Sequence, residues 1–295
     1  MIRAALAAIL ISIFLTACGG GGGGESSSPQ LPPSPPTVRT TPLRVGYFGI
    51  DGDQIRETAD HVTYVHAADW GEPYWNTPED RQTIGLRIIA QLQEAKARGV
   101  KEAWVSVGFL LFDTQQGCIS GWRYVPRATG LQELAAFRQQ LEALDLYSMV
   151  TVLYPVDEPE LHCLDDKTLT PVVAQIKSVW PAYTAVIYGD TVNYPGLSVY
   201  DLVGKDKYGD GAGVLQQLPP ITALQKWIVV PGGASPWRND PQPFFQFAHD
   251  HANVYAVITF TWFDRGAGQD SGAGVRSNGM APIYRQMACN ETEKC

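Results

Sequence analysis

Residues 147–160 read YSMVTVLYPVDEPE, a short apolar run that ends in acidic residues around a proline. Val150, Val152 and Leu153 belong to a run without a breaker, bounded by polar residues, which is the pattern of a buried β-strand. Acidic side chains directly after a strand lie at the carboxyl end of that strand, where α/β folds gather their functional groups. The stretch therefore predicts an α/β fold, with Glu158 as the first candidate functional residue.

The segment 1–18 has the pattern of an export signal. A basic residue, Arg3, precedes the apolar stretch 4–15, which is shorter than the roughly 20 residues that a transmembrane helix needs. Leu-Thr-Ala-Cys at its end resembles the lipobox of bacterial lipoproteins, in which the cysteine is acylated and becomes the mature amino terminus. We therefore expect a lipoprotein signal peptide with Cys18 as the lipidation site. A plain signal peptide with an incidental cysteine is the alternative.

Residues 19–41 are rich in glycine, serine and proline. Glycine and serine make a linker flexible, and prolines stiffen it into an extended conformation. Such a segment cannot bury a hydrophobic core. We expect a disordered tether that leaves membrane contact to the N-terminal lipid, and we expect the protein in the bacterial cell envelope, at the outer membrane or the cell surface.

Residues 42–295 remain for a folded domain, a length near the ~250 residues typical of a (β/α)8 barrel. The formal net charge of the chain is −8, so there is no electrostatic attraction to nucleic acid or to anionic lipid headgroups. The sequence has no zinc-like Cys/His spacing and no phosphate-binding glycine loop. We expect one domain that acts as a monomer, with no cofactor, no metal and no nucleic-acid partner.

Besides Cys18, the chain carries cysteines at four positions, and an exported protein is expected to pair them in one of three ways. Cys118 and Cys163 both follow predicted strands and would lie at the same face of a barrel. Cys289 and Cys295 are close in sequence and would hold a polar tail. We favour the disulfides Cys118–Cys163 and Cys289–Cys295.

Strand and helix patterns alternate along the domain. Thr77 is a helix cap followed by Pro78 at the first turn, and Gly99 ends that helix. Further helices are expected over 130–144, 168–180, 213–218, 244–251 and 280–287. The strand candidates are 43–50, 61–70, 101–109, 147–156, 184–190, 200–208, 226–233 and 253–264.

This alternation predicts parallel strands with right-handed crossovers. Eight strands in about 250 residues favour closure over an open doubly wound sheet. A dinucleotide-binding sheet would carry Gly-x-Gly-x-x-Gly after its first strand, and the chain has Tyr-Phe-Gly-Ile-Asp-Gly-Asp there. The prediction is a single-domain (β/α)8 TIM barrel of the α/β class.

The carboxyl ends of barrel strands face one common mouth. A ring of carboxylates and aromatic rings there suits the cleavage of a glycosidic bond: one acid protonates the leaving oxygen, a second carboxylate attacks or activates water, and aromatic faces hold the sugar. Packing acids together also raises the pKa of one of them. The candidates are Asp51 and Asp53 after the first strand, Glu158, Asp190 and Asp206 as catalytic carboxylates, and His66, Asp69, Trp70, Asp157, Tyr208 and Trp262 as substrate-binding residues.

The motif 156–159, Val-Asp-Glu-Pro, with Trp262 near the end of the eighth strand, resembles the glycoside hydrolase superfamily of (β/α)8 barrels whose general acid is a glutamate ending the fourth strand. The resemblance implies Glu158 as the acid/base. It also implies that Asp157 stands where the superfamily has an asparagine that binds a sugar hydroxyl.

The same superfamily takes its nucleophile from a glutamate that ends the seventh strand. Residues 228–235, Ile-Val-Val-Pro-Gly-Gly-Ala-Ser, contain no acid. Asp206 or Asp190 remains as the second carboxylate, and a separation of about 6.5–9.5 Å between the two carboxyl groups would favour inversion through an activated water.

Each candidate also has a purely structural interpretation. Glu158 could be a loop acid, Asp206 could pair with a neighbouring lysine, and Trp262 could fill the barrel. His66 fits a buried, hydrogen-bonded histidine, and Glu160 is expected to face solvent.

The functional prediction is a cell-surface lipoprotein that acts on an oligo- or polysaccharide as a glycoside hydrolase. The alternative from another class is a catalytically inactive barrel that binds carbohydrate at the cell surface. A metal-dependent hydrolase would need several histidines at strand ends, and only His66 is well placed.

Overall fold

The computed structural model describes residues 39, 41–49, 51–69, 75–264, 272–292 and 294–295. Contacts within the chain separate Met1–Pro35, which lies outside these ranges, from the unit Pro36–Cys295. Arg39, in the expected tether, already belongs to the folded unit, because its guanidinium donates to the carbonyl oxygens of Ala248 at 2.8 Å and Val254 at 2.7 Å. In the part of the chain that the structure describes, no helix combines the length and apolar character needed to cross a bilayer.

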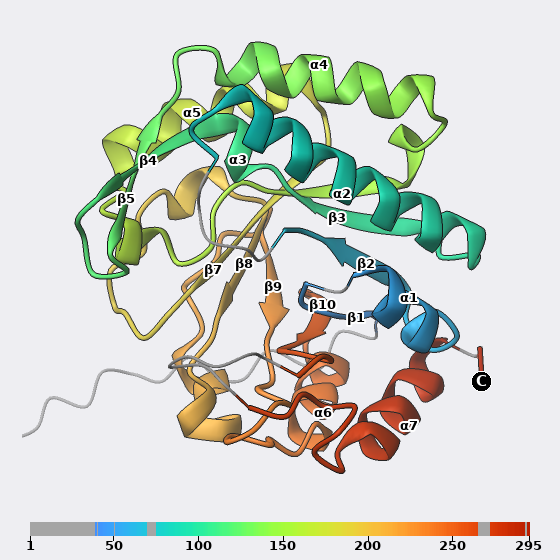
Figure 1. The fold of residues 1–295 in the computed structure, drawn as a ribbon. Helices are drawn as coiled ribbons and strands as arrows, with labels where there is room; N and C mark the ends of the chain where they lie inside the picture. The colour runs from blue at the N-terminus through green and yellow to red at the C-terminus, as the bar shows by residue number, and fades with distance from the viewer. Residues whose placement is uncertain (1–38, 40, 50, 70–74, 265–271, 293) are drawn as a thin grey trace, which may run out of the picture. The chain divides into compact units, whose positions relative to one another are not determined.

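Eight parallel strands form a nearly closed barrel, as the sequence predicted (Figure 1). Around the sheet the order is β1-β10-β9-β8-β7-β6-β3-β2, and every adjacent pair in this order is parallel. Between β1 and β2 the Thr63 N–H donates to Val45 O at 2.9 Å. The strands are β1 (Arg44–Tyr47), β2 (Tyr64–Ala67), β3 (Glu102–Ser106), β6 (Val150–Tyr154), β7 (Tyr183–Tyr188), β8 (Leu202–Lys205), β9 (Lys226–Val229) and β10 (Val254–Thr259).

Helices cover the outside of the barrel, with α2 and α4 on one side and α6 and α7 on the opposite side (Figure 1). The helices that follow β7 and β8, η3 and η4, are 3-10 helices, so the helix expected over 213–218 is part of η4. The bounds are α1 (Gly52–Thr58), α2 (Pro78–Ala97), α4 (Gly130–Ala143), η1 (Tyr147–Met149), α5 (Asp166–Val179), η3 (Leu197–Val199), η4 (Tyr208–Gln217), α6 (Gln242–Asp250) and α7 (Ala281–Thr292).

The start of α2 shows why this segment is helical. The Thr77 side chain accepts from the Asp80 N–H, the Asp80 side chain accepts from the Thr77 N–H, and Pro78 fills the first turn, which together satisfy backbone donors that have no partner within the helix. Gly99, at φ +77°, adopts the left-handed backbone that ends the helix. The predicted cap and stop of this helix are both confirmed.

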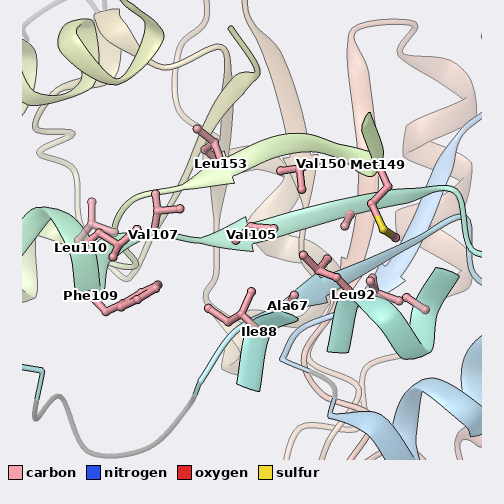
Figure 2. Packing of buried hydrophobic residues seen from close by; sticks show 14 of the residues in the cluster. Ala67, Ile88, Leu92, Val105, Val107, Phe109, Leu110, Met149, Val150 and Leu153 are labelled. Carbon is pink, nitrogen blue, oxygen red and sulfur yellow. The ribbon is translucent and has the colours of Figure 1, made fainter. Parts of the chain in front are cut away.

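The apolar face of α2 packs onto the strands. Figure 2 shows Ile88 and Leu92 of this helix beside Ala67 of β2 and Val105 of β3, within one buried cluster. Their spacing of four residues places Ile88 and Leu92 one turn apart on the same helix face. This packing holds β2 and β3 in place beside β6, the strand that precedes Asp157 and Glu158.

A separate cluster fills the inside of the barrel. Strand β8 shows the alternation: Leu202 packs in the interior cluster, whereas Val203 packs against the helices. The interior is closed by large rings, with Tyr64 and Trp104 stacked at 4.6 Å between ring centroids. Tyr64 fits because Gly46 has no side chain, since a Cβ there would lie 2.7 Å from the tyrosine ring.

Several short elements were not predicted, and α1 is one of them. Asp51 and Asp53, expected at the barrel mouth, instead belong to α1: the Asp51 side chain accepts from the Gln54 N–H as its cap, and the exposed Asp53 carboxylate pairs with Arg56. Also not predicted were α3 (Gly108–Leu111) and an antiparallel hairpin of β4 (Phe112–Gln116) and β5 (Trp122–Pro126).

The structure contains both favoured disulfides. Cys118, at the tip of the β4–β5 hairpin, is bonded to Cys163. Cys289 of α7 is bonded to Cys295. The first bond joins the hairpin to Cys163, the residue directly after η2 (Pro159–His162). This 3-10 helix begins directly after Glu158.

Candidate active site

Glu158 lies in the turn after β6. Its backbone is left-handed, at φ +41° and ψ +60°, a conformation that costs a non-glycine residue about 1–3 kcal/mol and that clusters at functional sites. The Glu158 N–H donates to Ile187 O of β7 at 3.0 Å, and its carbonyl accepts from the Leu161 N–H at 2.9 Å. These bonds hold the half-buried Glu158 at the mouth of the barrel.

Asp206 directly follows β8, on the other side of β7. Its N–H donates to Tyr188 O at 2.9 Å, and its carboxylate accepts a hydrogen bond from the Tyr208 hydroxyl at 2.7 Å. Burial and the neighbouring Asp157 carboxylate raise the pKa of Asp206 to about 8. Asp206 therefore holds a proton at neutral pH.

Asp157 accepts a short hydrogen bond from the hydroxyl of Tyr154, the last residue of β6. The pKa of Asp157 is raised to about 6, mainly by burial and also by the Glu160 carboxylate, while the Tyr154 hydrogen bond acts in the opposite direction. Two tyrosine–aspartate pairs thus face the same mouth. Each pKa is raised because the carboxylates lose water and approach one another.

Glu160, expected to face solvent, instead points into this cluster. Its Oε1 accepts from the Gly189 N–H at 2.7 Å, and its Oε2 is buried with no hydrogen-bond partner among the described residues. Burial raises the pKa of Glu160. A Cβ on Gly189 would collide with the Glu158 carboxyl group, so Glu158 and Glu160 both lie against this glycine. We name Asp157, Glu158, Glu160 and Asp206 the acid cluster.

The end of the seventh strand carries no acid, as the sequence indicated. Gly232 lies there, and a Cβ on it would be 2.7 Å from Tyr208 Cβ and 2.8 Å from two atoms of the Tyr208 ring. The tyrosine that donates to Asp206 therefore covers this glycine.

Aromatic rings flank the acid cluster on the β8–β10 side. The rings of Tyr208 and Phe260 are stacked, with centroids 4.9 Å apart, and Trp237 lies 4.7 Å from Tyr208. Phe260 and Trp237 were missed by the sequence analysis. Strand alternation could have found Phe260, because Ala256 and Ile258 point into the barrel and the next inward position is 260.

Several candidates lie away from the acid cluster. Asp190 is exposed and pairs with Lys207 Nζ at 3.2 Å. The Asp69 carboxylate pairs with Arg87 at 2.9 Å. Trp262 is buried against Tyr47 at 4.9 Å, and its Nε1 donates to Glu57 at 2.6 Å. Trp70 and Cys18 lie outside the described residues.

His66 is buried on β2, close to the barrel mouth. Its Nδ1 accepts from the Gly49 N–H at 3.3 Å, and its Nε2 lies 3.0 Å from the Ser106 hydroxyl. Burial lowers the pKa of His66 to about 3, so the ring is neutral. Within the described ranges no group of three or more His, Cys, Asp or Glu side chains is placed to hold a metal ion.

A cleft with a volume of about 460 Å³ is lined by one member of the acid cluster, Asp157. Tyr154 and Asp69 line the same cleft. The cleft extends along the β4–β5 hairpin, where Trp122 and Tyr124 line it. A cleft lined by carboxylates and aromatic rings can hold a ligand that has flat apolar faces.

Comparisons with known proteins give the fold. A scan against protein-family profiles and a search of curated proteins find no match. Among solved structures, the chain superposes on a GH113 β-1,4-mannanase with a TM-score of 0.50 and 10% identity over 84% of this chain and 97% of that one.

Two further structures are similar over most of their length. The GH113 β-mannanase AaManA from Alicyclobacillus acidocaldarius has a TM-score of 0.49 and 11% identity, covering 85% of this chain and 97% of that one. A chitinase from Rhizomucor miehei has a TM-score of 0.41 and 10% identity, covering 83% and 98%. At these identities the chain shares with the GH113 β-1,4-mannanase its (β/α)8 barrel fold.

Proposed function

We propose that the protein is a glycoside hydrolase that uses the acid cluster to cleave a glycan. The observation that carries the proposal is the convergence of four carboxyl groups at one barrel mouth, where the pKa of Asp206 is about 8 and that of Asp157 about 6. Glycosidic cleavage needs a carboxylic acid that keeps a proton near neutral pH beside a second carboxylate. The similarity of fold to mannanases agrees with this chemistry.

Glu158 and Asp206 form the catalytic pair in this proposal. Glu158 stands at the superfamily position of the acid/base, and its strained backbone agrees with a functional role. Asp206 is the second carboxylate. Burial is the main cause that raises the pKa of Tyr154 and of Tyr208, and the charges of Asp206 and Glu158 both add to it, so the two acids are electrostatic neighbours of the same hydroxyl groups.

The proton on Asp206 at neutral pH determines how the pair starts its cycle. In this proposal the proton of Asp206 passes to Glu158, which delivers it to the leaving oxygen as the glycosidic bond breaks. The ionised Asp206 then takes a proton from the water that attacks the sugar carbon. Asp157 binds a sugar hydroxyl from the position of the superfamily asparagine, held by Tyr154, and the stacked rings of Tyr208 and Phe260 hold an apolar sugar face.

A substrate panel with the Glu158→Gln variant tests the proposal. Purified protein is incubated with β-1,4-mannan, glucan, xylan and chitin, and released reducing ends are measured. We expect Glu158→Gln to lower turnover at least about 100-fold. The matched control is Asp190→Asn, which removes an exposed carboxylate paired with Lys207 and should keep wild-type turnover. Equal turnover in wild type and Glu158→Gln would contradict the assignment.

A carbohydrate-binding protein without catalysis is the second candidate. It is favoured by Gly232, which leaves the seventh strand without an acid and which Tyr208 covers. Calorimetric binding of an oligosaccharide that the protein does not hydrolyse would decide for this candidate.

The proposal includes a lipid anchor in the cell envelope. Its support is the lipobox-like sequence that ends at Cys18 and the glycine-rich segment after it. Labelling of expressing cells with radioactive palmitate should mark the wild-type protein and leave Cys18→Ser unlabelled. Equal labelling of both proteins would contradict lipidation at this cysteine.

A further inference from the structure

The β4–β5 hairpin extends the candidate active site beyond the barrel. Trp122 and Tyr124 of β5 line the cleft together with Trp75. Trp75 and Tyr124 pack edge to face, with centroids 5.4 Å apart and planes at 69°. Trp75 is fixed in turn, because its Nε1 donates to Phe112 O at 2.8 Å. The rings thus form a fixed aromatic wall.

The hairpin is held against η2 by several independent contacts. The Cys118–Cys163 disulfide joins the two segments, and the Ser120 N–H donates to Leu161 O at 3.0 Å. His162 stacks on Tyr124, with centroids 3.9 Å apart and planes at 17°. Because η2 begins directly after Glu158, these contacts fix the aromatic wall relative to the acid cluster.

The aromatic wall shares its cleft with Asp157 of the acid cluster. Asp157 and Tyr154 line the same cleft as Trp122 and Tyr124. Burial raises the pKa of Tyr124, and the Asp157 carboxylate raises it further, so the two side chains are electrostatic neighbours. A ligand bound at the acid cluster can therefore continue along the hairpin without leaving the cleft.

The charges of the cleft select against an anionic ligand. Among the described residues that line it, Asp69 and Asp157 are acidic and none is Lys or Arg. Burial lowers the pKa of His162, so this ring is neutral. The guanidinium of Arg127, close to the hairpin, is buried and bound to Asp113 at 2.8 Å and to backbone carbonyls.

From these observations we infer that the hairpin wall binds several units of an uncharged glycan chain, extending the substrate from the acid cluster past Tyr124 towards Trp122. The inference rests on the proposed glycoside hydrolase function and adds to it the class of substrate, a neutral oligo- or polysaccharide. It also adds specificity-determining residues that lie outside the catalytic pair.

Chain-length kinetics test the inference. The substrates are neutral oligosaccharides from disaccharide to hexasaccharide, of whichever backbone the wild type cleaves. We expect Trp122→Ala to lower kcat/KM about tenfold for the longest substrate, the loss expected for one ring contact, and to leave the shortest unchanged. Trp122→Phe should restore most of the loss, and Tyr183→Ala, which removes an exposed ring at the start of β7, should behave as wild type.

The outcomes separate this inference from the proposed function. Hydrolysis whose length dependence is the same in wild type and Trp122→Ala would overturn the inference and leave the function standing. If the wild type hydrolyses no substrate, the proposed function fails, and calorimetry with the neutral hexasaccharide tests the inference instead. Weaker binding by Trp122→Ala than by the wild type would support glycan binding at the aromatic wall. Equal binding by the two proteins would overturn the inference. Tighter binding of oligogalacturonate than of the neutral chain would also overturn it.

Discussion

Glu158 and Asp206 are held by consecutive carbonyl groups of one strand. Ile187 O accepts from the Glu158 N–H at 3.0 Å, and Tyr188 O accepts from the Asp206 N–H at 2.9 Å. Since β7 lies between β6 and β8, the two acids flank its end with their backbones two strand spacings apart, roughly 10 Å. The end of β7 thus sets the geometry of the proposed catalytic pair.

A pair that shares one reaction should give non-additive mutant effects. We expect Glu158→Gln and Asp206→Asn each to lower kcat about 100-fold or more, and the double variant to be little worse than either one. Steady-state kinetics on the best substrate checks this. Losses that multiply in the double variant would mean that the two residues act in separate steps.

The acid cluster should give a bell-shaped pH dependence. Above about pH 8 Asp206 loses the proton that the pair needs, and below about pH 6 Asp157 gains one and no longer accepts as a carboxylate. We therefore expect kcat/KM to be highest between these values and to fall on both sides. Activity that still rises above pH 9 would contradict a role for the proton on Asp206.

Tyr208→Phe should shift the alkaline side of this profile. The Tyr208 hydroxyl donates to the Asp206 carboxylate and holds its pKa down, so its removal should raise the pKa of Asp206 and move the fall in activity to higher pH. The control is Tyr200→Phe, because the buried Tyr200 hydroxyl has no hydrogen-bond partner among the described residues. If the alkaline side of the pH profile did not shift in Tyr208→Phe, the Tyr208 hydroxyl would not influence the pKa that governs that side.

Asp206→Asn should stabilise the folded protein at neutral and alkaline pH. The pKa of Asp206 is raised from 3.8 in a model compound to about 8 by folding. The stability that this carboxyl group contributes is therefore fully present below about pH 4 and is lost as pH rises towards 8. We expect the variant to melt a few degrees higher than wild type at pH 8 and at the same temperature at pH 3. Calorimetric melting at both pH values measures the difference.

Gly189→Ala should impair activity without unfolding the barrel. A methyl group there would collide with the Glu158 carboxyl group and crowd Glu160, so Glu158 has to move while the rest of β7 keeps its packing. We expect kcat to fall about 100-fold, as for loss of an acid/base group, with an unchanged circular dichroism spectrum. In Gly52→Ala, where nothing lies within 4 Å of the added methyl group, activity should remain at the wild-type level.

Most of the barrel could be predicted because its signals are local. The α2 cap at Thr77 and the apolar runs of the strands depend only on neighbouring residues, and both are present in the structure. The β4–β5 hairpin was missed because its strands are half exposed and lack a clear apolar alternation. Its position also depends on contacts with η2, such as the hydrogen bond from the Ser120 N–H to Leu161 O, which no local pattern contains.

Strand alternation explains which site residues could be predicted. On β8 the inward positions are 202, 204 and 206, so Asp206 faces the mouth; on β7 they are 185, 187 and 189, so Asp190 faces outward. This rule would have chosen between the two aspartates. It fails beyond the strand ends, where Trp262 packs outside the interior cluster and Glu160 turns towards Gly189, because tertiary contacts orient those turns.

The ring of Tyr208 over Gly232 has a consequence for engineering, because a Cβ at this glycine would meet Tyr208 Cβ and the tyrosine ring. A glutamate introduced at position 232 would compete with Tyr208 for one volume. Placing an acid at this end of β9 would therefore require that Tyr208 be replaced at the same time.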